Sequence, residues 1–411
     1  MGNKLSYDVA ISGAGLNGMV AALALGGSAT RTPLKIALID QRDPINLNNN
    51  DERASAITET SRRIFEAMGI WPQLKPHAEP IREIIITDSP NSSDRPTLLK
   101  FDESHQPGGP SAYIIKNSHL IGVLYAEIQR HQNIEINIGS PIIDYQNKLS
   151  KVIINLANNK LIHAKILLAA DGKNSEIRTK ANIESAGWGY DQSGIVTTIY
   201  HENPHEGRAE EHFRPAGPFA ILPLPSKKSS LVWTEKTSVA QEILKLNEEA
   251  FEAQLAERLG THLGNIKKIG QVTSWPLGLH LAKSFISDRV ALIGDAAHVI
   301  HPIAGLGFNL GMRDVAALAD IIFDAYRVGI DIGSRHVLEK YETARRPDTL
   351  KVAIATDGIN RLFSNDYEII RQVRDIGLKA VDKINPMKQF FMSEAAGLND
   401  NLPRLMKGEL A

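Results

Sequence analysis

The chain has 411 residues, a formal net charge of −1 and no cysteine. Without cysteine there is no disulfide, thiolate metal site or cysteine nucleophile, and the balanced charge gives no field directed at nucleic acid. No run reaches the roughly 18 uncharged apolar residues that a membrane span needs. We therefore expect a cytoplasmic protein of two or three domains that binds no nucleic acid. Because Glu–His pairs with metal-ligand spacing on a helix are missing, we also expect no metal.

The N-terminal residues predict a nucleotide-binding unit. A mostly apolar strand at 7–11 is followed by a G-x-G-x-x-G pattern and a helical stretch at 19–25. The pattern consists of Gly13, Gly15 and Gly18. Such glycines permit a tight turn, close backbone approach to a pyrophosphate and close helix–strand packing. A second strand at 35–39 ends on Asp40, where a carboxylate accepts hydrogen bonds from ribose hydroxyls. The unit predicts ADP recognition and leaves open whether the ligand is NAD or FAD.

The next segments give weaker signals. Arg53 lies in an acidic and polar stretch ahead of a helix through Met68, and it has two interpretations of equal weight. In the first interpretation Arg53 pairs with a phosphate of the ligand; in the second it belongs to a solvated charge cluster at the start of a helix. Residues 134–138 and 152–156 predict two short strands that form a hairpin or small sheet. Residues 165–170 predict a buried strand that ends at Asp171.

The stretch at 288–314 combines a strand, an acid, a glycine loop and a helix. The strand covers 289–293, Asp295 follows it, and the loop contains Pro302, Gly305 and Gly307. Glycines let the backbone approach a ligand closely, and a helix start offers unpaired N–H groups and a positive dipole end. The combination indicates a bound cofactor, with a purely structural α/β crossover as the alternative.

Three acids share one position, directly after a predicted buried strand: Asp40, Asp171 and Asp295. In open α/β sheets the ligand crevice lies at the carboxyl ends of the strands. We therefore expect these carboxylates to form a polar rim around one extended ligand.

The pattern changes from about residue 181, where proline-punctuated runs at 195–200, 219–222 and 230–234 predict antiparallel strands. After residue 326 the periodicity is mostly helical. The predicted fold is α/β, with a Rossmann-like nucleotide-binding domain (an FAD-binding domain by the resemblance described next), an inserted antiparallel-sheet substrate domain and a helical C-terminal region. We expect the first domain to comprise 1–75, 113–180 and 275–330, the second 76–112 and 181–274, and the helical region 331–411.

Together these motifs resemble the FAD-dependent aromatic hydroxylases of the para-hydroxybenzoate hydroxylase superfamily. GAGLNG resembles the ADP-binding fingerprint, LLAADGKNSEIR the DG motif, and RVALIGDAAHVIHPIAGLGFNLGMRD the GD motif with its flavin loop. DERASAITETSRRIFEAMGIW and GPFAILPLP are similar to segments of the ubiquinone-biosynthesis hydroxylases within the superfamily. The resemblance covers nearly the whole chain.

The resemblance implies roles for particular residues. Asp40 would bind the adenosine ribose, Asp295 the ribityl chain, and Arg53 would lie near the pyrophosphate. Pro302 would lie near the reacting ring, and His298 is a candidate base with a hydrogen-bonded structural role as its alternative. The full set implied to bind FAD is Gly13, Gly15, Gly18, Asp40, Arg53, Asp171, Asp295, Gly305, Gly307 and Asn309.

The activity implied is hydroxylation of the ring of a prenylated phenol or quinol in ubiquinone biosynthesis, through a flavin hydroperoxide formed with O2. NAD(P)H or a ferredoxin-type protein would be the electron donor. Three alternatives stay open: a flavoprotein reductase or dehydrogenase for an isoprenoid or quinone, a hydroxylase of a soluble aromatic acid, and a non-enzymatic member of a biosynthetic complex. As partners we expect the prenylated substrate, a homo-oligomer or biosynthetic complex, and peripheral contact with the inner membrane through the amphipathic residues 384–392. Packing of those residues on the core is the alternative.

Overall fold

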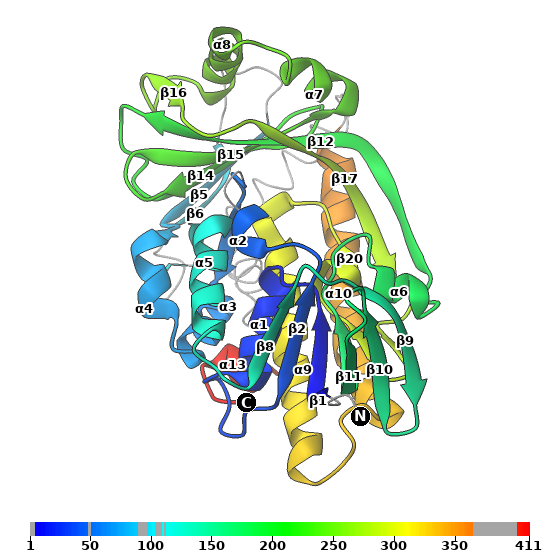
Figure 1. Cartoon of the computed structure of the whole chain (residues 1–411). Coiled ribbons are helices and arrows are strands. Elements are labelled where there is room, and N and C mark those ends of the chain that lie inside the picture. Colours follow the sequence, from blue (N-terminus) through cyan, green and yellow to red (C-terminus); the bar gives the residue numbers. More distant parts are fainter. Residues whose placement is uncertain (1–4, 48–50, 89–96, 103–108, 111, 365–400) are drawn as a thin grey trace.

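The computed structural model describes residues 5–47, 51–88, 97–102, 109–110, 112–364 and 401–411. It contains three sheets among these residues, with the largest at the top of Figure 1 and the nucleotide-binding unit below it. The predicted helix at 367–381 and the amphipathic residues 384–392 lie outside the described part. No helix in the described ranges is long and apolar enough to cross a bilayer.

The lower body is built on an eight-stranded sheet in the order β18-β19-β11-β1-β2-β8, extended by β10 and β9. The pairs β11–β19, β1–β11, β1–β2 and β2–β8 are parallel, so their carboxyl ends share one edge. The strands are β1 (Leu5–Ser12), β2 (Ile36–Asp40), β8 (Ile134–Ile138), β9 (Ile142–Lys148), β10 (Lys151–Leu156), β11 (Leu161–Ala169), β18 (Ile286–Ser287) and β19 (Val290–Leu292). The two strands expected at 134–138 and 152–156 are present as β8 and β10, but they form neither a hairpin nor a small sheet of their own. β8 extends the parallel sheet beside β2, and β10 pairs with β9 and β11.

Helices cover this sheet because its strands are apolar on both faces, as parallel strands must be. Helix α1 (Leu16–Gly26) packs against α5 (Asn117–Ile128) and α9 (Leu306–Arg327), and α9 packs against α10 (Arg335–Phe363). Shorter helices are α2 (Pro44–Leu47), α3 (Glu59–Ala67), α4 (Trp71–Leu74), α6 (Glu176–Lys180) and α13 (Arg404–Lys407). One continuous apolar cluster joins the strands and helices of this body.

The upper sheet has nine strands in the order β20-β17-β12-β15-β14-β13-β5-β6, with β16 paired to β12. These strands are β5 (Glu83–Asp88), β6 (Thr97–Asp102), β12 (Ser185–His201), β13 (Arg208–Phe213), β14 (Phe219–Leu224), β15 (Lys228–Lys236), β16 (Ile266–Lys268), β17 (Thr273–Ala282) and β20 (His298–Val299). Its outer face packs on α7 (Thr237–Ile243) and α8 (Glu248–Leu259), around Trp233 and Phe251. Its other side, called the inner face here, carries Ala209 and Phe213 and looks toward the lower body.

A small third sheet lies between the two large ones. It consists of β3 (Ala54–Thr58), β7 (Ala112–Lys116) and β4 (Glu79–Pro80). Ala54, Ala56 and Ile114 of this sheet pack on Ala209 and Leu222 of the inner face. The predicted α/β class, with its Rossmann-like sheet, antiparallel sheet and helical C-terminal part, is confirmed. The domain boundaries stay a prediction, and β17 begins just before the expected boundary at 275.

Candidate FAD-binding site

The glycine motif forms a turn between β1 and α1. Gly13 has a φ of +104°, and an added Cβ there would lie 2.3 Å from the carbonyl oxygen of Ala170. At Gly18 a Cβ would lie 1.9 Å from the carbonyl oxygen of Gly13. Gly15 is exposed, and a Cβ would meet no described atom within 4 Å. Gly13 and Gly18 therefore serve the turn and its packing, while Gly15 leaves space in front of the helix.

The N-terminus of α1 is open toward that space. No side chain of the described residues caps it, and its first turn carries no acid. Unpaired N–H groups and the positive end of the helix dipole make such an end favourable for an anion. The geometry is that of a pyrophosphate cradle.

Asp40 lies at the carboxyl end of β2, beside this turn. Its Oδ2 accepts a hydrogen bond from Ala14 N at 2.7 Å, and its Oδ1 accepts one from Arg42 N at 2.9 Å. Each carboxylate oxygen can accept a second hydrogen bond. Asp40 is therefore oriented by the protein and still able to accept from a ribose hydroxyl.

Asp171, at the end of β11, is used mainly inside the protein. Its Oδ1 accepts from Ser175 Oγ at 2.6 Å and its Oδ2 from Ile177 N at 3.2 Å. Burial raises the pKa of Asp171, and these hydrogen bonds offset part of the rise. The acid shapes the turn that leads into α6 and supports the crevice edge from below.

Arg178 follows in the same turn and had no role assigned from the sequence. Its guanidinium donates to the carbonyl oxygens of Ala296 at 2.9 Å and Lys173 at 2.8 Å. It therefore ties the turn after β11 to the segment that carries Asp295. The signal in the sequence was an arginine a few residues after the strand-end acid Asp171; that the arginine is buried is shown only by the structure.

Asp295 and Arg53 lie near enough to each other for their charges to interact. The Asp295 carboxylate is exposed to solvent but closely surrounded by protein, and this burial raises its pKa. Three neighbours offset part of that rise: His298, Arg53 and Lys173. Arg53 binds Asp51 through Nε at 2.8 Å and Nη2 at 2.7 Å, and its guanidinium lies 4.7 Å from the Trp275 ring centroid. The arginine is thus held at the same edge as the acid.

The flavin loop, residues 302–309, leads into α9. Gly305 has a φ of +62° and caps α9, which has no side-chain cap among the described residues and no acid in its first turn. A Cβ on Gly307 would meet no described atom within 4 Å. Pro302 is exposed. A second helix N-terminus without a side-chain cap among the described residues therefore begins at this loop.

Asn309 is turned into the protein rather than toward the crevice. Its Nδ2 donates to the carbonyl oxygens of Ala56 at 2.7 Å and Gly305 at 3.1 Å, and its Oδ1 accepts from Thr58 N at 3.1 Å. Asn309 therefore holds the loop against β3. Its side chain has little left to offer a cofactor.

His298 belongs to a buried charge network around Asp314. Its Nε2 lies 2.6 Å from Asp314 Oδ2, which also accepts from Gly294 N at 3.0 Å, while Asp314 Oδ1 accepts from Arg345 Nε at 2.8 Å. His298 is 1% exposed and Asp314 0%. Burial alone would raise the pKa of Asp314, but His298 and Arg345 overcome it and leave the pKa below its usual value. This geometry favours the hydrogen-bonded structural role of His298 over that of a base.

His301 immediately precedes Pro302 and is fully buried. Neither ring nitrogen has a hydrogen-bond partner among the described residues, and the ring meets Tyr190 edge-on at 5.3 Å. Burial lowers the pKa of His301 to about 4, so the ring is neutral at pH 7. It packs behind the flavin loop without adding positive charge there.

The arrangement fits FAD. The carboxyl ends of β1, β2, β11 and β19 share one edge, which places the glycine turn and all three predicted acids together. Gly15 and the α1 N-terminus would hold the pyrophosphate, Asp40 the ribose, and Asp295 the sugar chain of the flavin half. The N-terminus of α9, which Asn309 holds against β3, would face the flavin ring. Asn309 uses its amide inside the protein, and His298 binds Asp314 through Nε2, while its buried Nδ1 has no partner among the described residues.

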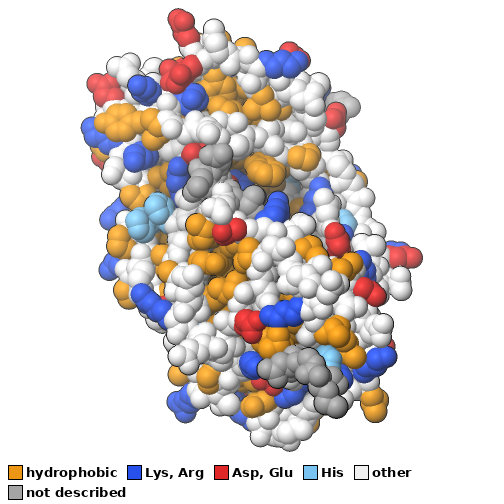
Figure 2. All heavy atoms as spheres, in the orientation of Figure 1, with side chains coloured by type: hydrophobic (Ala, Val, Ile, Leu, Met, Phe, Trp, Pro, Cys, Tyr) orange, Lys and Arg blue, Asp and Glu red, His pale blue; other side chains and the backbone are white. Residues whose placement is uncertain are grey.

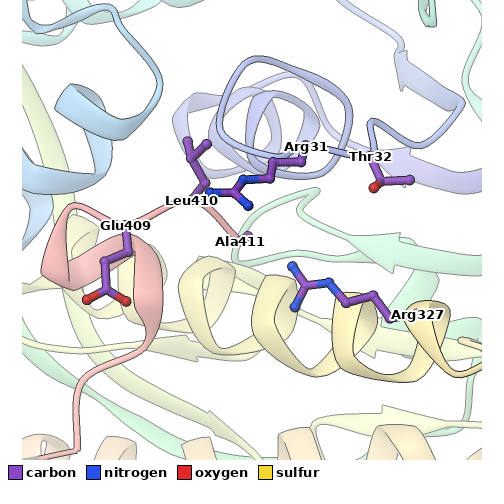
Figure 3. Close-up of a pocket in the computed structure, with 6 residues that line it drawn as sticks. All are labelled: Arg31, Thr32, Arg327, Glu409, Leu410 and Ala411. Atoms are coloured by element: carbon purple, nitrogen blue, oxygen red, sulfur yellow. The ribbon is translucent and has the colours of Figure 1, made fainter.

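A separate hollow of about 650 Å³ lies at the other end of α9 (Figure 3). Arg31, Arg327 and Glu409 line it with the last residues of the chain. Arg327 ends α9 and Gly307 is near its start, so at 1.5 Å per residue the hollow is roughly 30 Å from the flavin loop. It is not part of the cofactor site.

Comparison with known proteins agrees with this geometry. The FAD binding domain family matches residues 6–355. The ubiquinone hydroxylase UbiL of Rhodospirillum rubrum is 37% identical over 406 residues, covering 98% of this chain and 92% of the relative. The mitochondrial ubiquinone biosynthesis monooxygenase COQ6 of Danio rerio is 30% identical over 438 residues, covering 95% and 90%.

Solved structures share the fold. The p-nitrophenol 4-monooxygenase PnpA of Pseudomonas putida DLL-E4 superposes with a TM-score of 0.80 at 18% identity, covering 97% of this chain and all of the other. PqsL of Pseudomonas aeruginosa, a probable FAD-dependent monooxygenase, gives 0.74 at 20% identity and covers 91% and 99%. From the family match and the two relatives, the chain belongs to the FAD-binding monooxygenases, in the branch of the ubiquinone-biosynthesis hydroxylases.

Proposed function

We propose that this protein hydroxylates the aromatic ring of a prenylated phenol or quinol on the route to ubiquinone. The observation that carries the proposal is the inner face of the nine-stranded sheet. It is mainly apolar and shares an apolar cluster with the flavin loop, in which Phe213 and Ile303 lie with Phe363 and Ile86 packs against them. Relatives named as ubiquinone hydroxylases match almost the full length of the chain. An apolar wall beside a flavin site suits an aromatic ring with an apolar tail.

FAD would supply the oxygen-activating redox chemistry with O2 and an electron donor. The residues of this chain supply binding and electrostatics. The α1 N-terminus and Gly15 bind the pyrophosphate, and the Asp314 network fixes Gly294 and so positions Asp295. The positive end of α9 stabilises negative charge on the flavin ring. The inner face excludes water from the ring that is hydroxylated.

The proposal extends to the binding of the substrate's prenyl tail, the location of the protein in the cell and its domain boundaries. The inner-face strands within 181–274 would form the wall of the tail pocket. The protein would be cytoplasmic, meet its substrate at the inner membrane surface, and act as a homo-oligomer or within a biosynthetic complex. The FAD-binding domain would comprise 1–75, 113–180 and 275–330, with the substrate domain at 76–112 and 181–274.

The intermediate that accumulates in cells lacking this protein tests the function. Mass spectrometry of their lipid extracts should detect a prenylated ring that is one oxygen lighter than the next intermediate. Restoring the protein should remove it, and an Asp295→Ala variant should not. Normal ubiquinone without any accumulated precursor would contradict the proposal.

Ligand binding distinguishes a prenylated substrate from the alternative substrate, a soluble aromatic acid. The purified protein should bind a prenylated phenol more tightly than the same ring without its tail, because each buried methylene contributes up to about 0.8 kcal/mol. Equal affinity for the two ligands would indicate a soluble substrate instead.

A further inference from the structure

Glu211 is a carboxyl group in an otherwise apolar row of the inner face. On β13 it is paired with Ile86 of β5 and Ala220 of β14. Because directly paired residues share a face, the row can be followed across five strand pairs. Its members are Leu99, Ile86, Glu211, Ala220, Val232 and Val196. One acid in such a row is unexpected for a wall that only packs.

The neighbours of Glu211 along β13 fix what it faces. Ala209, two residues before it on the same face, packs on Ile114 of the three-stranded sheet. Phe213, two residues after it, belongs to one apolar cluster with Ile303 of the flavin loop and stacks on Phe363 with ring centroids 4.0 Å apart. Glu211 therefore lies between these two contacts, where the inner face looks toward the flavin loop. Figure 2 shows the surface hollowed between the upper sheet and the body below it.

Glu211 has no hydrogen bond or ion pair to any residue that the structure describes. It keeps part of its surface accessible, and burial raises its pKa to about 7. The adjacent Glu210 points to the outer face and is paired twice, with His212 at 2.9 Å and His262 at 2.7 Å. Those contacts hold the pKa of Glu210 at about 2, below its usual value despite burial. The two glutamates thus differ because one is satisfied by the protein and the other is not.

A carboxyl without a partner in an apolar wall costs stability, since its charge loses water and gains no compensating contact. A structural role explains Glu210 but not Glu211. A polar ligand group that reaches the inner face at Glu211 would supply the missing partner. A phenolic hydroxyl is a donor of the right kind, because a carboxylate only accepts hydrogen bonds.

We propose that Glu211 binds the hydroxyl group of the substrate ring and so sets which ring carbon faces the flavin loop. The inference rests on the proposed function and assigns the ring's polar contact to this one side chain. The carboxylate accepts the hydrogen bond of the hydroxyl, and no covalent bond changes. The apolar members of the row contact the ring and its tail.

A cycle of two ligands and two proteins tests the contact by binding alone. The ligands are a prenylated phenol and its O-methyl ether, which has the same ring and tail but no donor. The proteins are the FAD-loaded wild type and Glu211→Leu, studied at a pH well above 7, where Glu211 is ionised, and without reductant so that no turnover occurs. Wild type should prefer the phenol by roughly 10- to 100-fold, the range for a hydrogen bond to a charged group. Glu211→Leu should bind both ligands within about threefold of each other.

Glu210→Gln is the matched control, because it changes the neighbouring glutamate on the outer face and should keep the wild-type preference. Thermal unfolding gives a second readout: Glu211→Leu should be at least as stable as wild type, since it removes an unpartnered acid from an apolar row. An unchanged preference in Glu211→Leu, with wild type still discriminating, would overturn this inference alone. A wild type that binds neither ligand would overturn the proposed function together with it.

Discussion

Replacing Asp314 by asparagine should destabilise the protein strongly, although the side chain keeps its shape. Asp314 is fully buried and accepts from Arg345 Nε at 2.8 Å and Gly294 N at 3.0 Å, with His298 Nε2 at 2.6 Å. Asparagine removes the negative charge and leaves the buried Arg345 guanidinium with Asp348 as its remaining counter-charge. Breaking one side of a buried ion pair costs about 3–5 kcal/mol. Asp348 also binds Arg345, at 2.6 Å, and still compensates part of its charge in the variant. The expected loss of unfolding free energy is therefore at the lower end of that range, about 3 kcal/mol.

The same network predicts a pH dependence. Because the pKa of Asp314 is lower in the folded protein than its usual value, its contribution is fully present above that usual value, about 3.9. The contribution is lost as the pH falls through the folded pKa. The difference in unfolding free energy between wild type and Asp314→Asn should therefore be constant near neutral pH and shrink below about pH 4.

Urea unfolding followed by circular dichroism, at pH 7 and in steps down to pH 3.5, measures both effects. Asp324→Asn, on the exposed side of the same helix, is the matched control and should change the unfolding free energy by less than about 1 kcal/mol. An Asp314→Asn protein within 1 kcal/mol of wild type at pH 7 would show that the network does not hold the helices together.

Five further substitutions test the FAD site and Glu211. Asp295→Ala should lose FAD while its circular dichroism spectrum stays that of a folded protein, and normal flavin occupancy would refute its role. Gly15→Val should also fold without FAD because a side chain there meets no described atom, whereas Gly13→Ala should fail to fold, since its Cβ would lie 2.3 Å from a carbonyl oxygen. Gly307→Asp should lower the flavin reduction potential or abolish binding by opposing the positive end of α9, and an unchanged potential with intact binding would place that helix away from the ring. Glu211→Gln should gain stability over wild type as the pH rises from about 4.5 to about 7, because the raised pKa of Glu211 makes its ionisation costly only in the folded state. A difference in unfolding free energy between the two proteins that does not change with pH would contradict this.

The sequence predicted those parts of the fold in which local pattern and topology agree. Glycine spacing between a strand and a helix is local, so the turn around Gly13 could be recognised without tertiary information. The rim acids Asp40, Asp171 and Asp295 followed from one rule, that parallel strands place their carboxyl ends at one edge. The pairing of β8 was missed because strand order depends on contacts that are distant along the chain, and a short run carries no sign of its partner.

The missed residues are those whose role depends on what lies opposite them. Asp314 interrupts the apolar face of the helix after the flavin loop, and that interruption was a readable sign of a buried partner. Arg345, however, lies on a different helix, so the partner itself could not be named. For Glu211, alternation with Ala209 and Phe213 would have placed it on an apolar face, but β13 is short and was not predicted as a strand. The roles of Asp314 and Glu211 both depend on their burial, and burial is a tertiary property.

Oxygen transfer to the ring is the most direct test of the account. The purified FAD-loaded protein should be given a prenylated phenol, an electron donor and ¹⁸O2, with NAD(P)H and a ferredoxin-type protein tried separately. The account predicts a product in which one labelled oxygen is bonded to the aromatic ring, formed only when the phenol is present. Oxidation of the donor without labelled product, or a reduced substrate with no added oxygen, would contradict it and identify a reductase on the same scaffold.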